Sequence, residues 1–173
     1  MENYRKLLSN IKAFIFDVDG VFTDGSIILT PEGEQLRTMN VKDGYALQLA
    51  VKKGFSVAII SGGISEAVQI RFERLGLTDI YMGVSNKLDI YETYINQKGL
   101  TSAEILYMGD DIPDFQIMNI VGMPACPNDA VDEIKKISKY ISHACGGKGC
   151  VRDVVEQTMK VQGKWLDHDA FLW

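Results

Sequence analysis

The stretch "AFIFDVDGVFTDG" at residues 13–25 decides the fold. Its apolar start leads into Asp17 and Asp19, one position apart, and the chain then reaches Gly20. A short apolar run that ends at turn residues is typical of a strand buried on both faces of a sheet. Two neighbouring carboxylates at its end repel each other. The pair therefore marks either the entry to a solvated loop or a place where a positive group lies between them.

Three further apolar runs follow the first, separated by stretches with helical spacing. The runs are "SVAII" (56–60), "DIYMGV" (79–84) and "EILYMG" (104–109), and the helical stretches are 65–76, 86–99 and 110–122. Strands that alternate with helices predict an α/β fold, a Rossmann-like open parallel sheet flanked by helices and joined by right-handed crossovers.

Residues 26–41 interrupt this alternation. They predict two short strands around the turn "PEGE", which is a β-hairpin inserted after the first strand. A chain of 173 residues without a visible linker fits a single domain at 1–173, with a C-terminal tail at about 163–173. The aromatic residues of the tail leave two alternatives, a frayed end or docking on another subunit.

Composition excludes several classes of function. The net charge of −5 with no basic block argues against a nucleic-acid partner, and no apolar run is long enough for a membrane span. The start of the chain lacks the pattern of a signal peptide. Three cysteines without C-x-x-C spacing, Cys126, Cys145 and Cys150, favour reduced thiols in a cytoplasmic protein over disulfides or a zinc site.

Polar residues come directly after the carboxyl ends of the predicted strands. In open α/β sheets this is where ligands bind. The residues are Asp17, Asp19, Ser61, Gly62, Gly63, Lys87, Asp110 and Asp111. Such a set can transfer a phosphoryl group through an aspartyl-phosphate: Asp17 and Asp110 could hold Mg²⁺, and Asp19 could move the proton. Ser61, Lys87 and the glycine amides would bind phosphate oxygens. Each residue alone has an ordinary interpretation as a loop, a helix cap or a surface lysine, but their joint order favours a site.

The segments "DVDGV", "IISG", "NK" and "GDDIPD" resemble the four motifs of the haloacid dehalogenase superfamily. The resemblance implies Mg²⁺ as cofactor, and an aspartate at position 19 favours hydrolysis of a phosphate monoester. The implied roles are Asp17 as nucleophile and metal ligand, Asp19 as general acid/base and metal ligand through its carbonyl, Ser61, Gly62 and Lys87 for phosphate, Asp110 for metal, and Asp111 and Asp114 in support.

The intervals between these motifs leave no room for a cap domain over the site. The segments 43–50, 146–154 and 162–165 resemble one capless group, the phosphatases of 3-deoxy-D-manno-octulosonate 8-phosphate (Kdo 8-phosphate) in lipopolysaccharide biosynthesis. This resemblance implies a homotetramer in which neighbouring subunits close each site, with Lys148 or Arg152 near the substrate or a neighbour's site. Many members read T-G-R where this chain has Ser61-Gly62-Gly63, so a phosphatase for a nine-carbon sialic-acid-type 9-phosphate is the alternative.

Two other classes are less consistent with the sequence. A signalling receiver domain would carry its acceptor aspartate after a middle strand, where this chain has "SGG". A catalytically idle assembly subunit would not need the complete set of catalytic groups.

Overall fold

The computed structural model describes residues 4–171 as an α/β fold built on a six-stranded parallel sheet. The strands lie in the order β5-β4-β1-β6-β7-β8. Their bounds are β1 (Ala13–Phe16), β4 (Ser56–Ile60), β5 (Asp79–Tyr81), β6 (Ile105–Met108), β7 (Met123–Cys126) and β8 (Tyr140–Ile141). The predicted open parallel sheet is confirmed.

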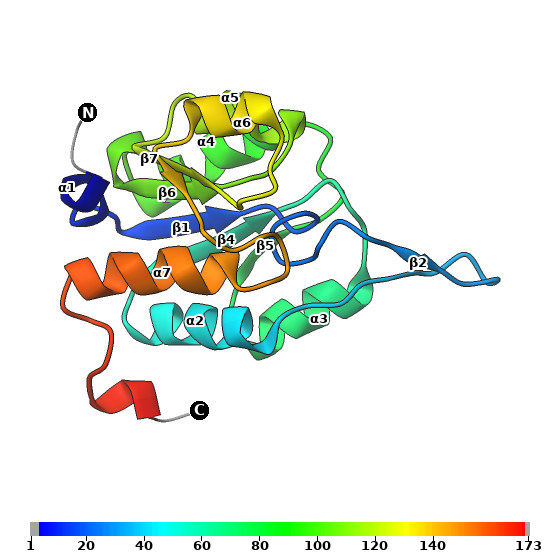
Figure 1. The fold of residues 1–173 in the computed structure, drawn as a ribbon, viewed down its shortest axis with the longest axis horizontal. Helices are drawn as coiled ribbons and strands as arrows, with labels where there is room; N and C mark the ends of the chain where they lie inside the picture. Colours follow the sequence, from blue (N-terminus) through cyan, green and yellow to red (C-terminus); the bar gives the residue numbers. More distant parts are fainter. Residues whose placement is uncertain (1–3, 172–173) are drawn as a thin grey trace.

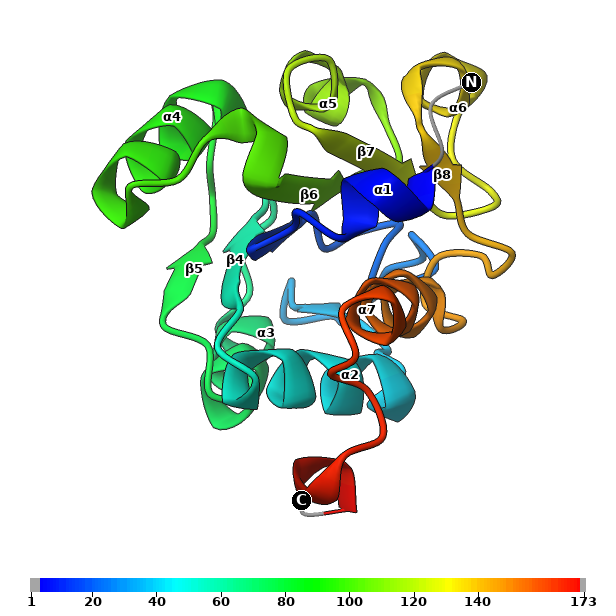
Figure 2. The same cartoon turned by 90° about the vertical axis from the view of Figure 1, so that its left-hand side faces the viewer.

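Helices cover both faces of the sheet (Figures 1 and 2). One face carries α2 (Val41–Lys52), α3 (Glu66–Arg74) and α7 (Cys150–Val161), and the other carries α4 (Lys87–Lys98), α5 (Phe115–Met118) and α6 (Asp132–Ile137). The short helix α1 (Tyr4–Leu8) packs against α7 and β7. Short 3₁₀ turns are η1 (Ser102–Glu104), η2 (Ile112–Asp114) and η3 (His168–Phe171). No helix within residues 4–171 combines the length and apolar character needed to cross a membrane.

The alternation of side chains along β1 explains why both faces are covered. Phe14 and Phe16 enter the core beneath α2 and α7, whereas Ala13 and Ile15 enter the core on the α4–α6 face. All four are fully buried. Because every second residue of a strand points to the same face, a run of four apolar residues requires a hydrophobic layer on each side.

The structure departs from the sequence-based boundaries after the fourth motif. The predicted helix at 110–122 is instead η2 followed by the short α5. Asp111 accepts a hydrogen bond from the amide of Ile112, and Asp114 is fully buried, so the chain here turns tightly to bring Asp114 inward. The strand β7 was not predicted, since Pro124 within it is a residue that sheets disfavour.

The predicted hairpin consists of β2 (Ile28–Leu29) and β3 (Gln35–Leu36), paired antiparallel. It projects far from the sheet (Figure 1) and exposes 73 % of Leu29. Between β1 and β4 the described chain holds this hairpin and α2, so no cap domain is inserted there.

The C-terminal tail folds back onto its own chain. Trp165 is 7 % exposed and belongs to the hydrophobic cluster that includes residues of α2 and α7, and the guanidinium of Arg152 lies 4.5 Å from its ring and 5.2 Å from the ring of Tyr45. Lys53 Nζ lies 2.5 Å from Asp167 and also pairs with Asp169. Neither a frayed end nor docking on another subunit accounts for Trp165. Leu172 and Trp173 lie outside the described residues.

Replacing Trp165 with Ala should lower the free energy of unfolding by about 3–5 kcal/mol, because removing the buried ring leaves a cavity. Urea unfolding measures the change. The matched control is Phe171→Ala in the same tail, where 77 % exposure predicts a change within about 0.5 kcal/mol. An unchanged Trp165→Ala midpoint would mean that the tail does not pack as described.

Candidate active site

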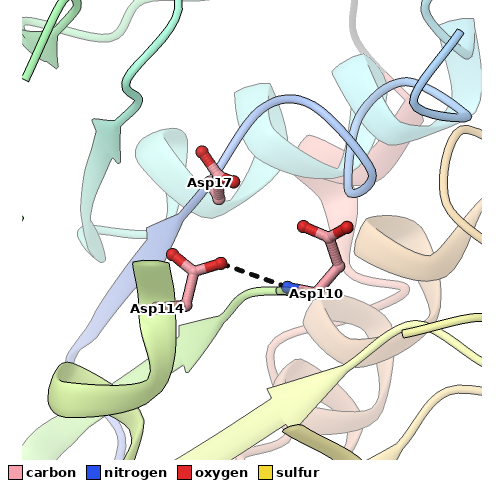
Figure 3. A group of neighbouring side chains, drawn as sticks. All are labelled: Asp17, Asp110 and Asp114. Carbon is pink, nitrogen blue, oxygen red and sulfur yellow. Dashed lines mark hydrogen bonds between the residues drawn. The ribbon is translucent and has the colours of Figure 1, made fainter. Parts of the chain in front are cut away.

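The alignment of β1 with β6 builds the centre of the site. Phe16 pairs with Met108, and the amide of Asp17 donates to the Met108 carbonyl at 3.0 Å. The residues that follow the two strands therefore meet at one edge of the sheet, with Asp17 beside Asp110 and Asp114 (Figure 3).

Three carboxylates form a cluster there. One oxygen from each of Asp17, Asp110 and Asp114 lies within 4.8 Å of the others. Burial, followed by the charge of Asp114, raises the pKa of Asp17 to about 6, although Lys87 opposes this. Burial, Asp17 and Asp114 raise the pKa of Asp110 to about 7. The cluster thus holds more negative charge than its surroundings neutralise, which a divalent cation would relieve.

The carboxylates of the cluster differ in the hydrogen bonds that they accept. Asp114 Oδ1 accepts from Lys87 Nζ at 2.7 Å and from the Tyr107 hydroxyl at 2.6 Å, and its Oδ2 accepts from the Asp110 amide at 3.2 Å. The Asp110 carboxylate accepts no hydrogen bond from residues 4–171. Asp17 and Asp110 therefore fit a hard cation such as Mg²⁺, which prefers oxygen ligands, while Asp114 is committed to orienting its neighbours.

Gly20 allows the loop after β1 to pass close to this cluster. A Cβ at position 20 would lie 2.0 Å from Asp110 Oδ2, and the residue has a φ of 81°. Any side chain here would collide with the carboxylate and strain the backbone.

Lys87 provides a buried positive charge beside the carboxylate cluster. Its side chain is 7 % exposed, and Nζ lies 2.9 Å from Asp17 Oδ1 and 2.7 Å from Asp114 Oδ1. Burial alone would lower the pKa of Lys87, but Asp17 and Asp114 outweigh burial and raise it. Asn86 caps α4 by accepting from the Leu88 amide, so the helix begins with a charged lysine at the cluster.

Ser61 begins the loop that follows β4. It is buried, and its Oγ accepts from the Gly63 amide at 3.2 Å. The loop is fixed from the other side because the Val84 amide donates to the Ser61 carbonyl at 3.0 Å. Gly62 and Lys87 line one cavity of about 380 Å³, which places the loop and the lysine around a common space.

A larger cleft of about 850 Å³ opens beside the same loop. Its lining joins the loop, the start of α3 and the hairpin, and comprises 33–36, 62–67 and Ile70. The cleft has space for a substrate much larger than phosphate, and the hairpin forms one of its walls.

Asp19 points to a different partner from Asp17. Its carboxylate forms a two-point ion pair with Arg37, at 2.8 Å from Nε to Oδ1 and 2.9 Å from Nη2 to Oδ2. Asp111 is exposed and serves as the cap of η2.

The two residues expected near the substrate or a neighbour's site have other contacts within this chain. Lys148 Nζ lies 3.4 Å from Asp24, on a loop whose Gly147 amide donates to the Val21 carbonyl. Arg152 stacks against Tyr45 and Trp165 and pairs with Glu156 at 2.8 Å. In the described chain Arg152 therefore packs α7 against the tail rather than joining the carboxylate cluster.

Sequence reasoning missed Tyr107 and Arg37. Tyr107 carried a signal, because a hydroxyl in a fully buried strand needs a hydrogen-bond partner. Arg37 carried none, since nothing in the hairpin sequence shows that its side chain returns to Asp19.

Comparison with known proteins agrees with this geometry. Residues 58–146 match the family described as haloacid dehalogenase-like hydrolase. The chain belongs to this family.

Within the family the chain is similar to one group. It is 36 % identical over 155 residues to 3-deoxy-D-manno-octulosonate 8-phosphate phosphatase KdsC of Salmonella typhi, covering 90 % of this chain and 82 % of the relative. A solved Moraxella catarrhalis phosphatase of the same name, in complex with magnesium, phosphate and KDO, superposes with a TM-score of 0.92 at 32 % identity, covering 99 % of this chain and 97 % of that one. The solved phosphatase of the same name from Yersinia pestis superposes with a TM-score of 0.90 at 33 % sequence identity. The match covers 92 % of this chain and 86 % of that one.

Adding Mg²⁺ should stabilise the protein more as pH rises from 5 to 8. In the metal-free protein, Asp17 and Asp110 bind protons up to about pH 6 and 7, whereas unfolded aspartates release them near 3.8. Between about pH 3.8 and 7 the folded metal-free protein therefore binds more protons than the unfolded chain. Its free energy of unfolding falls as pH rises through this range. Because Mg²⁺ needs ionised ligands, its stabilisation is small at pH 5 and reaches about 2.7 kcal/mol at 100 times the Kd at pH 8. Thermal unfolding with Mg²⁺ or a chelator measures it.

Asp110→Asn is the control for this experiment. It should remove the Mg²⁺ effect and stabilise the metal-free protein at pH 8, since one repelling charge is gone. A pH-independent Mg²⁺ shift, or a full shift in Asp110→Asn, would contradict the cluster as the binding site.

Proposed function

We propose that the protein is a magnesium-dependent phosphatase that hydrolyses Kdo 8-phosphate to Kdo and phosphate in lipopolysaccharide biosynthesis. The observation that carries the proposal is the buried Lys87 held between Asp17 and Asp114 at the carboxyl end of β1. This arrangement brings a nucleophile and a phosphate-binding cation together in a chain that is similar to KdsC phosphatases over most of its length.

The reaction needs two carboxylates with separate tasks. An oxygen of Asp17 attacks phosphorus and the bond from phosphorus to the ester oxygen breaks, while Asp19, which has to carry a proton in this half of the reaction, gives that proton to the departing alcohol. Asp19 then takes a proton from water, whose oxygen attacks phosphorus, and phosphate leaves as Asp17 is restored. When bound by Asp17, Asp110 and the carbonyl of Asp19, Mg²⁺ would supply positive charge that lets the anionic phosphate approach an anionic nucleophile.

The remaining donors hold the phosphate. Lys87 provides a fixed positive charge, and the hydroxyl of Ser61 and the amide of Gly62 provide hydrogen bonds. Asp114 and Tyr107 act indirectly, since their hydrogen bonds keep Lys87 and the Asp110 backbone in place. The sugar would extend from the phosphate into the cleft between the loop and the hairpin.

Asp17→Asn should reduce phosphate release by roughly 10³-fold or more, because the amide cannot act as the nucleophile. Asp89→Asn, an exposed aspartate on α4, is the matched control and should keep full activity. Release is measured with Kdo 8-phosphate and with a nine-carbon sialic-acid-type 9-phosphate. A higher kcat/KM for the nine-carbon ester would show that this ester, and not Kdo 8-phosphate, is the substrate. An active Asp17→Asn variant would exclude Asp17 as the nucleophile.

We further propose that the protein assembles as a homotetramer through its hairpins, with neighbouring subunits closing the clefts. Ile28, Leu29 and Leu36 expose 59 %, 73 % and 47 % of their surface on an element that projects from the body. Apolar residues concentrated on a projecting hairpin are typical of an interface. The hairpin also forms a wall of the cleft, so a subunit seated on it would lie near the substrate.

Leu29→Glu should shift the protein to smaller species, because a charge would be buried in the interface. Light scattering after gel filtration measures the mass. Leu166→Glu, equally exposed at 73 % but in the tail, is the control and should leave the mass unchanged. A monomeric wild type at micromolar concentration would contradict the tetramer.

A cytoplasmic location is the compartment we propose. Cys126, Cys145 and Cys150 are free thiols, and two of them are buried. Free buried thiols are consistent with a reducing compartment.

A further inference from the structure

Arg37 links the hairpin to the catalytic edge of the sheet. It follows β3, and its Nη1 donates to the Gln35 carbonyl of the hairpin at 3.0 Å. From this anchor its Nε and Nη2 reach both oxygens of Asp19 at 2.8 and 2.9 Å. The arginine side chain is only 4 % exposed, so the ion pair is shielded from solvent on the arginine side.

Thr23 supports Asp19 from the other side. It is fully buried, and its hydroxyl donates to Asp19 Oδ1 at 3.3 Å while accepting from the amides of Gly20 and Gly25 at 3.2 Å each. Asp19 Oδ1 thus receives donors from two segments of the chain. Oδ2 is held through Arg37.

Gly63 shows which way the pair faces. A Cβ at position 63 would lie 3.2 Å from Asp19 Oδ2, 3.3 Å from Arg37 Nη2 and 3.6 Å from Ser61 Oγ. The contact between Nη2 and Oδ2 therefore lies directly against the loop that we propose binds phosphate. The absence of a side chain at position 63 leaves the space that the guanidinium and the carboxylate share.

We propose that Arg37 is a positioning residue for Asp19, fixing the carboxylate so that Oδ2 faces the ester oxygen that leaves. The proposal rests on the phosphatase function proposed above. Two parallel hydrogen bonds from a planar guanidinium fix both the direction and the plane of a carboxylate, whereas a lysine can fix only one contact. Such orientation matters because proton transfer depends steeply on the placement of the donor.

Leaving-group dependence tests the proposal. An alkyl ester such as Kdo 8-phosphate needs a proton on its departing oxygen, whereas p-nitrophenyl phosphate departs as a stable anion. Arg37→Met should lower kcat/KM for the alkyl ester about tenfold or more and for the aryl ester less than about threefold. Arg37→Lys should recover part of the loss. Lys42→Met, which removes an exposed cation just after the hairpin, should change neither value.

The Asp19→Asn background separates positioning from substrate binding. If Arg37 acts through Asp19, adding Arg37→Met to Asp19→Asn causes no further loss. A further loss with a raised KM would show that Arg37 binds the substrate itself and would overturn the proposal. Equal losses on both esters, or faster turnover of the alkyl ester by Arg37→Met, would also overturn it.

Two controls keep the result interpretable. The Mg²⁺-induced thermal shift of Arg37→Met should equal that of the wild type, which shows that the fold and the cluster are intact. If the wild type hydrolyses p-nitrophenyl phosphate and glucose 6-phosphate but not Kdo 8-phosphate, the proposed substrate is wrong. The esters compared for Arg37→Met are then glucose 6-phosphate and p-nitrophenyl phosphate. This comparison tests the role of Arg37 independently of the proposed substrate.

Discussion

The site depends on the buried ammonium of Lys87. Its Nζ lies between Asp17 and Asp114, and without it three carboxylates would be left with only repulsion between them. Even with the lysine, burial and then the neighbouring carboxylates raise the pKa values of Asp17 and Asp110 to about 6 and 7, so the lysine alone does not offset the cost of ionising both groups. Three buried or half-buried carboxylates with oxygens within 4.8 Å of one another suit a divalent cation, since buried charges are tolerated only when paired or bound to metal. Stability and cation binding therefore depend on the same residues.

The parallel sheet makes such a concentration of charge possible. Matching register aligns the ends of β4, β1 and β6, so residues far apart in sequence reach one edge while their strands stay buried on both faces. The stability that the acidic edge costs is supplied by the two hydrophobic layers behind it. Asp114 connects the two regions, because its buried carboxylate binds Lys87 in front and the hydroxyl of strand residue Tyr107 behind.

The sequence predicted the parts of this design that are local. Polar residues directly after predicted parallel strands placed Asp17, Ser61 and Asp110 at one edge, because the carboxyl ends of parallel strands meet at the edge where ligands bind. The pairing of Arg37 with Asp19 and the packing of Trp165 on Arg152 could not be predicted. Both join segments whose approach is set by tertiary packing, and neither leaves a periodic pattern. The resemblance places Arg152 near the substrate or a neighbour's site, and that prediction stays untested, but no sequence pattern indicates the contacts that Arg152 makes with Tyr45 and Trp165 within the chain.

The structure gives the hairpin a role at the site that the sequence did not predict. A capless hydrolase leaves its cleft open, and the hairpin supplies a wall of that cleft together with an exposed apolar surface. Arg37 at its base adds a rigid contact to Asp19. If subunits pack on the hairpin, restricting the hairpin backbone also restricts the arginine, because the Nη1 contact to the Gln35 carbonyl joins the side chain to that backbone. Because the contact of Arg37 with Asp19 already exists within one chain, packing on the hairpin would stabilise an orientation of Asp19 that the fold itself provides, and one side chain would connect assembly to the site.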